Sequence, residues 1–282
     1  MAQTTVRLAM GQMLVEGGRL GENLRRAGEM IAQSASQGCQ IVVLPECLDL
    51  GWTHPSARRL AEPIPGPTSD QLCRAAADVA VYVVAGLTER AAERIYNAAV
   101  LIAPDGQILL NHRKINTLEI EQDLYATGDR LAVAHTPLGT IGLDICADNF
   151  PDSLCIAHTL ARMGAQLLLS PSAWAVPAEH DPVAEPYGGL WIGSFTTLAK
   201  LYEMPVVGVS NVGWLSAGPW QGRKCIGCSL AVGGDGQILA QAPYGETAEC
   251  LTVVDVELTP RRATGTAIAE MLRRKGYLNG LA

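Results

Sequence analysis

Two short apolar runs, far apart in the chain, share one pattern and predict buried strands. Residues Gly38–Glu46 read GCQIVVLPE and residues Gly164–Ser172 read GAQLLLSPS, so each run ends at a proline. A continuous apolar run of this length is typical of a strand that is buried on both faces. Helical segments precede the two runs, at Leu20–Ser36 and at Ser153–Met163.

The pentapeptide DGQIL also occurs twice, at residues 105–109 and 235–239, and both copies join two apolar runs. This position of Asp-Gly predicts β-hairpins. With further strands at Val6–Met10 and Ile141–Ile145, each half reads strand, helix, strand, helix and hairpin. Common patterns can also make two unrelated α/β halves look alike. The repeat predicts an α/β fold in which two mixed sheets, related by a pseudo-two-fold, pack as a four-layer α-β-β-α sandwich.

The repeat places polar residues at one edge of the predicted sheets. Glu46 follows one buried strand, and Ser172 lies at the equivalent end of the other. Cys146 ends a third apolar segment, opposite Gly11 and Gln12. A carboxylate at the mouth of a buried strand costs free energy unless it is paired or neutral, so Glu46 is a candidate for proton transfer. The alternative is a surface glutamate just past the strand.

Cys146 and Lys114 add a possible nucleophile and a positive charge. A thiol between a strand and a helix can meet backbone N–H groups and the positive end of the helix, and both favour the nucleophilic thiolate. Taken alone, Cys146 could equally be a small buried hydrophobe. Lys114 ends the first hairpin, and the segment from there to Gly128 is long for a simple connection. Long ordered loops often form active-site walls, although a lysine after a strand can also be solvated.

Composition narrows the class of protein. The 282 residues are 48% hydrophobic and 17% charged, which suits one large α/β domain or two small ones. The net charge of -7, without a basic patch, argues against binding to nucleic acid or membranes. We find no signal peptide and no apolar run long enough to span a bilayer, and therefore expect a cytoplasmic protein whose eight cysteines are reduced. The lone pair Cys225 and Cys228 lacks zinc-ligand partners, and its role stays open.

Three separated motifs resemble one family. Leu44-Pro45-Glu46, Arg113-Lys114 and Ile145-Cys146-x-Asp148 stand in the order and approximate spacing of the nitrilase (carbon–nitrogen hydrolase) superfamily. The similarity runs from Val6 to about Leu258 and includes Asn23, Tyr96-Asn97-Ala98-Ala99 and Thr127-Gly128-Asp129. The fold that this resemblance implies is the α-β-β-α sandwich reached above from the repeat. It also implies one catalytic domain at residues 1–258 and a tail at 259–282 that contributes to a homodimer or higher homo-oligomer.

The resemblance implies a role for each motif residue. Cys146 would be the nucleophile, Glu46 the general base and acid, and Lys114 the electrophilic support. Lys114 and the backbone N–H of Ala147 would stabilise the charge on the attacked carbonyl oxygen. A second glutamate of the family looks like Glu121, with Glu119 as the alternative. This chemistry passes through a thioester and needs no metal or cofactor.

Departures from the commonest form of the family motif restrict the expected class of substrate. Ala147 replaces an aromatic residue, the Trp-Glu pair of many nitrilases is absent, and Asp148 resembles the amide-cleaving branches. We therefore expect a small amide or an N-carbamoyl amine, with nitriles and N-carbamoyl amino acids as alternatives. The segment 172–189 holds three acids and no Lys or Arg, which favours a neutral or cationic substrate, although Arg223 could reach in. Residues expected to line the pocket are Trp52, Trp174, Trp191, Ser172 and Ala147.

Other classes have weaker support. A cysteine–histidine enzyme would need His112, His135 or His158, but no papain-like or caspase-like motif accompanies them. Gly-x-Ser-x-Gly, P-loop and Gly-x-Gly-x-x-Gly motifs are also missing. A catalytically silent scaffold or sensor of the same fold remains the alternative from a different class.

Overall fold

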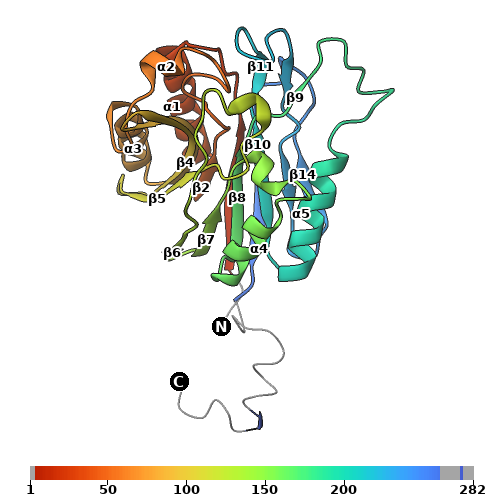
Figure 1. The fold of residues 1–282 in the computed structure, drawn as a ribbon. Coiled ribbons are helices and arrows are strands. Elements are labelled where there is room, and N and C mark those ends of the chain that lie inside the picture. The colour runs from red at the N-terminus through yellow and green to blue at the C-terminus, as the bar shows by residue number, and fades with distance from the viewer. Residues whose placement is uncertain (1–3, 261–273, 276–282) are drawn as a thin grey trace.

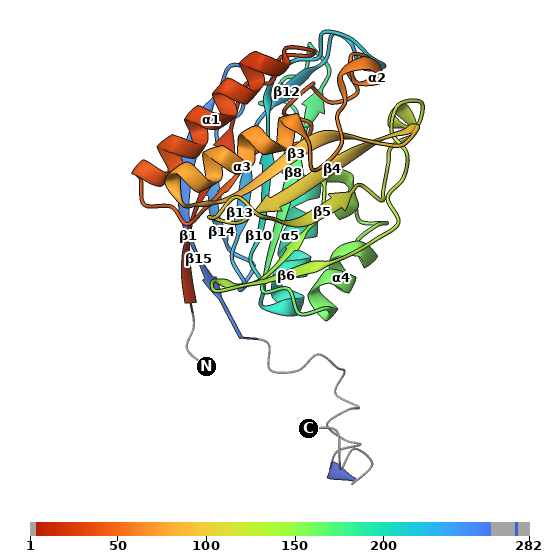
Figure 2. The same ribbon diagram turned by 90° about the vertical axis from the view of Figure 1, so that its left-hand side faces the viewer.

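The computed structural model describes residues 4–260 and 274–275, and two six-stranded mixed sheets lie face to face in it (Figures 1 and 2). The first sheet has the order β15-β1-β2-β3-β4-β5, comprising β15 (Cys250–Leu258), β1 (Thr4–Gln12), β2 (Ile41–Val43), β3 (Tyr82–Ala91), β4 (Arg94–Ile102) and β5 (Ile108–Arg113). The second has the order β14-β13-β10-β8-β7-β6, comprising β14 (Ile238–Gln241), β13 (Leu230–Val232), β10 (Val206–Ser210), β8 (Leu167–Ser172), β7 (Gly139–Leu143) and β6 (Val133–Thr136).

Helices form the two outer layers. The first sheet is covered by α1 (Leu20–Ser36) and α3 (Pro67–Val79), and the second by α4 (Cys155–Arg162) and α5 (Gly189–Tyr202) (Figures 1 and 2). A short helix, α2 (Ala57–Leu60), lies beside the first sheet near the end where its loops gather. The predicted four-layer α-β-β-α sandwich is confirmed.

The two sheets repeat one strand arrangement. In the first, β1, β2 and β3 are parallel, and β4 and β5 follow as antiparallel strands. In the second, β7, β8 and β10 are parallel, and β13 and β14 follow in the same way. An antiparallel strand flanks each sheet, β15 on β1 and β6 on β7. Both predicted Asp-Gly hairpins are present, between β4 and β5 and between β13 and β14.

Some predicted boundaries are wrong near the sheet edge. The predicted strand at Ile141–Ile145 ends at Leu143, so Cys146 lies three residues beyond it, at the start of the 3-10 turn η2 (Cys146–Asn149). Just past the strand, the Asp144 N–H donates to the Leu169 carbonyl at 3.2 Å, and its side chain accepts from Asn149 at the end of that turn. The helix predicted at Ser153–Met163 is shorter, spanning Cys155–Arg162.

A small third sheet lies at the end of the molecule beyond the carboxyl ends of the parallel strands (Figure 1). It joins β11 (Val212–Trp214), β12 (Lys224–Ile226) and β9 (Ala175–Val176). Its strands of two or three residues are too short for a hydrophobic period, which is why the sequence pattern did not predict it.

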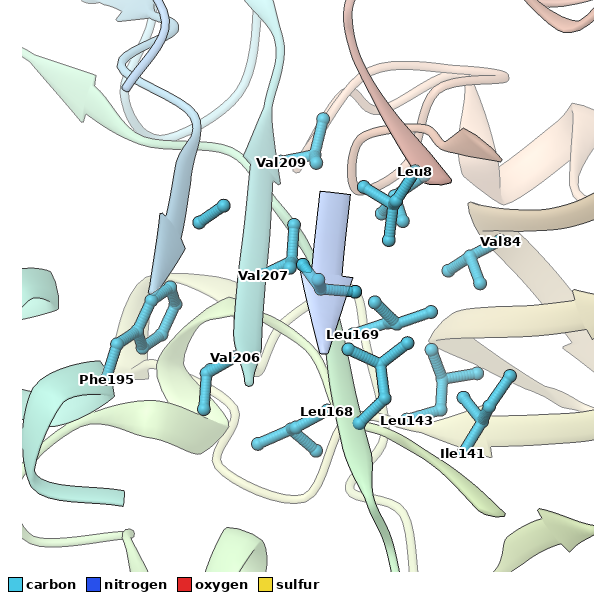
Figure 3. Close-up of a cluster of buried hydrophobic side chains, with 14 of the residues drawn as sticks. Leu8, Val84, Ile141, Leu143, Leu168, Leu169, Phe195, Val206, Val207 and Val209 are labelled. Carbon is cyan, nitrogen blue, oxygen red and sulfur yellow. The ribbon is translucent and has the colours of Figure 1, made fainter. Parts of the chain in front are cut away.

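The core explains why the parallel strands are apolar on both faces. Leu143, Leu169 and Val207 lie between the sheets, on the side of Leu8 and Val84 of the first sheet (Figure 3). Their strand neighbours point the other way: Leu168 and Val206 pack toward Phe195 of α5 (Figure 3). Every one of these side chains is at most 1% exposed. Successive side chains of a strand point to opposite faces of the sheet, so a strand that is buried on both faces needs an apolar residue at every position.

Most of the predicted C-terminal tail at 259–282 lies outside the described residues, so its expected oligomer contacts are not described either. None of the helices in the described part of the chain has the length and apolar character needed to cross a bilayer.

We predict that Leu169→Ala, which removes a fully buried side chain between the sheets, lowers the free energy of unfolding by about 2–5 kcal/mol. Urea denaturation measures the loss. Leu201→Ala on α5 is the control because Leu201 is 60% exposed, and its effect should stay within about 0.5 kcal/mol. Equal losses in the two variants would contradict the assignment of Leu169 to the intersheet core.

Candidate active site

A buried ammonium group lies between two buried carboxylates at the carboxyl edge of the first sheet. The Nζ atom of Lys114 donates to Oε1 of Glu46 at 2.9 Å and to Oε1 of Glu121 at 2.7 Å. All three residues are at most 1% exposed. Lys114 directly follows β5, where its N–H donates to the Asn97 carbonyl and its own carbonyl accepts from the Gly128 N–H. The sheet and the end of the long loop therefore fix its backbone on both sides.

Glu46 is held by one carboxylate oxygen. It lies beyond β2, and its N–H donates to the carbonyl of Ser172 across the two sheets. Its Oε1 accepts from Lys114 and, at 2.6 Å, from the amide nitrogen of Asn97. Its Oε2 has no hydrogen-bond partner among the described residues, although it is buried. One oxygen is thus fixed, and the other can accept a proton.

Gly86 of β3 allows the turn at Glu46 to approach the sheet. A Cβ atom at this position would lie 2.4 Å from the Glu46 Cα and 2.6 Å from the Pro45 carbonyl oxygen. Sequence reasoning missed this glycine and the role of Asn97, which served only as a mark of family resemblance. An isolated glycine in a strand pattern was the available signal, because it often marks a close backbone approach.

The structure places Glu121 at Lys114, whereas Glu119 is exposed at the other end of the 3-10 turn η1 (Glu119–Glu121). Oε2 of Glu121 accepts from the Leu118 N–H at 3.0 Å, and Oε1 accepts from the Trp52 indole N–H as well as from Lys114. Trp52 was expected to line the substrate pocket. In the structure, its polar atom is bound to Glu121, and its ring packs edge-on against Trp220.

Cys146 has a left-handed backbone, with φ 45°, which few residues other than glycine adopt without support. Its N–H donates to the Ser170 hydroxyl at 3.1 Å, and that hydroxyl also accepts from the Asn149 side chain. Cys146 as a residue is 7% exposed, and its sulfur accepts a hydrogen bond from the backbone N–H of Ala173. Sequence reasoning did not predict these contacts of Ser170 and Ala173.

The charges around the thiol favour a proton on sulfur in the resting state. Burial, and then the negative charge of Glu46, raise the pKa of the Cys146 thiol, while Lys114 and the Ala173 N–H oppose the rise. Burial also raises the pKa of Glu46, against the attraction of Lys114. Burial disfavours the Lys114 ammonium, but Glu121 and Glu46 outweigh it and raise its pKa. Glu46 is therefore a suitable proton acceptor beside a permanent positive charge.

Comparison with known proteins agrees with these observations. The family model for carbon–nitrogen hydrolases matches residues 7–265. The chain belongs to the carbon–nitrogen hydrolase family. A nitrilase from Pyrococcus abyssi is 32% identical over 84% of each chain. An omega-amidase from Xenopus tropicalis is 33% identical over 60% of this chain and 63% of the relative, so the match spans less than two thirds of the omega-amidase.

Solved structures show the same fold. A carbon–nitrogen hydrolase from Helicobacter pylori superposes with a TM-score of 0.79 at 22% identity, covering 98% of this chain and 95% of the other. An amidase from Nesterenkonia sp. gives a TM-score of 0.75 at 22% identity, covering 98% of each chain. The match of the family model over residues 7–265, with which this fold agrees, confirms the resemblance to the nitrilase superfamily.

The other residues that were expected to line the pocket differ in what they offer a ligand. The Ser172 hydroxyl donates to the Ser170 carbonyl, and the Ala147 carbonyl accepts from Asn116. Trp174 stacks on Trp191 with ring centroids 4.9 Å apart. The Trp174 indole N–H is buried, and nothing in the described part of the chain accepts it.

Next to Trp174, the segment after β9 lines a cavity of about 450 Å³. The polar residues that line it are Glu179, His180, Asp181, Glu185 and Tyr187. No lysine or arginine is among its lining residues. The Arg223 guanidinium instead lies over the Trp220 ring, 4.0 Å from its centroid. Its lining therefore offers a ligand three carboxylates and no ammonium or guanidinium group.

The remaining cysteines and histidines have other contacts. Cys225, in β12, is buried and hydrogen-bonded to Asn211, and burial raises the pKa of its thiol to about 12. His158 binds the Tyr202 hydroxyl, and His112 binds Asp148. Within the described ranges, no group of three or more His, Cys, Asp or Glu side chains could hold a metal ion.

Asp144 provides a test of the charge distribution behind Cys146. Burial, and next the negative charge of Asp148, raise its pKa from 3.8 to about 7. The folded protein thus keeps this proton up to about pH 7, whereas the unfolded chain loses it near pH 4. Stability should fall by a few kcal/mol as pH rises through this range. Asp144→Asn cannot ionise, so the difference in unfolding free energy between wild type and this variant should change with pH. A constant difference from pH 4 to pH 7 would refute the shifted pKa.

Proposed function

We propose that this chain hydrolyses the C–N bond of a small amide or N-carbamoyl amine through a thioester on Cys146. The observation that carries the proposal is the bridge from Lys114 to Glu46 and Glu121, in which the second oxygen of Glu46 has no partner in the described part of the chain. The charges of Glu46, Lys114 and Glu121 all act on the Cys146 thiol. A nucleophile, a base and a fixed positive charge are the groups that acyl transfer requires.

Acylation begins when Glu46 takes the proton of the Cys146 thiol and sulfur attacks the carbonyl carbon. Negative charge then develops on the carbonyl oxygen, where the Lys114 ammonium and the Ala147 N–H stabilise it. The tetrahedral intermediate collapses with cleavage of the C–N bond. Glu46 returns its proton to the leaving nitrogen, which departs as ammonia or an amine.

Deacylation uses the same groups in reverse. Glu46 removes a proton from a water molecule, which attacks the thioester carbon, and the proton then returns to the thiol of Cys146. Glu121 keeps the Lys114 ammonium in place at 2.7 Å and, unlike Glu46, has both carboxylate oxygens bound to N–H donors. We therefore assign proton transfer to Glu46 and a holding role to Glu121.

Two observations support an amide substrate that is neutral or cationic. Several vertebrate relatives are named omega-amidases, including one from Bos taurus that is 34% identical over 60% of this chain. We assign part of the substrate to the cavity beside Trp174, whose lining does not include Glu46, Lys114 or Cys146. This lining has acidic residues and lacks an arginine that could bind a carboxylate in bidentate fashion. Nitrile hydrolysis is the second candidate, because the Pyrococcus abyssi relative is named a nitrilase.

The proposal includes one catalytic domain over residues 1–258, and we expect the enzyme to act in the cytoplasm as a homodimer or larger homo-oligomer. Small-molecule substrates without nucleic-acid or membrane partners agree with the net charge of -7. No metal or cofactor enters the proposed steps.

We predict that the purified enzyme releases ammonia from small amides or N-carbamoyl amines, and that Cys146→Ala abolishes the release. A screen over amides, nitriles and N-carbamoyl compounds measures this. Preference for N-carbamoyl amino acids over uncharged amides would refute the charge assignment. Ammonia release that persists in Cys146→Ala would refute the assignment of Cys146 as the nucleophile. A lack of ammonia release from every compound would favour a catalytically silent scaffold.

Loss of Lys114 should lower kcat by about 100- to 1000-fold, because one donor to the oxyanion disappears. Lys114→Met alone also leaves two buried carboxylates facing each other, which destabilises the fold. The double variant Lys114→Met/Glu121→Gln removes one charge of each sign and is the variant to assay for kcat. Glu121→Gln alone, which keeps the ammonium, is its matched control and should retain more activity. A folded double variant with near-normal kcat would exclude the role of Lys114.

The pH dependence of kcat/KM should reflect the ionisation of the Glu46 carboxyl group. Because Glu46 must be ionised to accept the thiol proton, kcat/KM should fall as pH falls through a pKa above the ordinary glutamate value. Glu46→Gln should lose activity at every pH. A rate that is independent of pH in the acid range would contradict this role.

A further inference from the structure

Asp148 is a buried carboxylate with an unusual set of partners. Its Oδ1 accepts the N–H of Ile115 at 3.0 Å and of Asn116 at 2.7 Å, directly after Lys114 in the chain. Its Oδ2 accepts the N–H of Ile145 at 3.1 Å, directly before Cys146, and lies 2.9 Å from Nε2 of His112. The side chain is 0% exposed. One carboxylate thus holds the backbone beside Lys114 and the backbone beside Cys146.

A second set of hydrogen bonds reinforces the same connection. The Asn116 amide donates to the Ala147 carbonyl at 2.7 Å and to the Ser153 hydroxyl at 2.9 Å. That hydroxyl in turn donates to the Ala147 carbonyl at 2.7 Å. The residue after Cys146 is therefore tied to a residue only two positions beyond Lys114.

These contacts matter because Lys114 and Cys146 come from different sheets. Lys114 follows β5 at the edge of the first sheet, and Cys146 follows β7 of the second. No strand pairing relates the two segments, so their separation depends on side chains that cross between them. Cys146 also has a left-handed backbone, which persists only where the surroundings hold it.

We propose that Asp148 is a positioning residue that sets the separation between the Lys114 ammonium and the Cys146 thiol. Its two oxygens fix the two backbone segments, and His112 keeps the carboxylate in place. The inference rests on the proposed roles of Lys114 and Cys146. Asp148 itself does not touch the substrate.

Asp148→Asn tests the proposal because it keeps the shape of the side chain. An amide has one accepting oxygen and one NH₂ group, whereas N–H donors face both oxygens of Asp148. In either orientation, one segment meets an NH₂ group in place of an acceptor. Either Lys114 or Cys146 therefore loses its anchor.

The measurement is the rate of Cys146 alkylation by iodoacetamide as a function of pH, followed by peptide mass spectrometry to separate Cys146 from the other seven cysteines. It needs no substrate, so it remains informative if the proposed hydrolysis is wrong. Lys114 opposes the rise of the thiol pKa. We expect Asp148→Asn to move the alkylation midpoint upward by about 1 pH unit or more, which is a tenfold lower rate at neutral pH. For any amide that the wild type hydrolyses, kcat should fall about a hundredfold with little change in KM.

Val256→Ala is the control for general destabilisation, since Val256 is fully buried in β15 of the first sheet, away from these contacts. It should lower stability and leave the alkylation profile unchanged. A folded Asp148→Asn protein with the wild-type profile, or an equal shift in Val256→Ala, would overturn the proposal. If Asp148→Asn does not fold, His112→Asn is the variant to measure. It removes one contact to the Asp148 carboxylate and should move the alkylation midpoint upward by a smaller amount. An unchanged profile in that variant would also overturn the proposal.

Discussion

The buried contact of Lys114 with Glu46 and Glu121 is the constraint on which the rest of this site depends. Removing three charged groups from water is unfavourable, and only close pairing makes it tolerable. The distances of 2.9 Å and 2.7 Å supply that pairing, and Asn97 and Trp52 bind the same two carboxylates. The three residues together carry one excess negative charge when all are ionised. Burial, with a smaller contribution from the negative charge of Glu121, raises the pKa of Glu46 against the attraction of Lys114, whereas the two carboxylates raise the pKa of Lys114. Glu46, rather than Lys114, is therefore the group that can take a proton.

The two-sheet architecture delivers these groups to one place. Glu46 and Lys114 follow strands of the first sheet, Cys146 follows a strand of the second, and the hydrogen bond from Glu46 to the Ser172 carbonyl joins the sheets at this edge. The repeated strand order therefore positions the site as well as forming the core. It brings the carboxyl ends of equivalent strands together, so that residues distant in the chain can act on one thiol.

How much of this could be predicted from the sequence depends on whether a feature is local. The apolar runs, the Asp-Gly hairpins and the helix Leu20–Ser36 were predictable because each rests on a short-range pattern. Glu46, Lys114 and Cys146 were singled out by their positions after strands and by motifs. The contacts of Gly86, Asn97 and Asp148 were not, because each depends on which distant backbone lies next to it. For the same reason, the sequence suggested Trp52 as a pocket residue but could not predict that its indole N–H binds Glu121.

The most direct test of catalysis by Cys146 is to trap the covalent intermediate. The enzyme would be mixed with a small amide from which it releases ammonia, quenched in acid within one turnover, and analysed by peptide mass spectrometry. We expect an acyl adduct on the Cys146 peptide that hydroxylamine removes, as is typical of a thioester, and no adduct on the other seven cysteines. Product formation without any adduct on Cys146, or an adduct of the same amount on another cysteine, would contradict it.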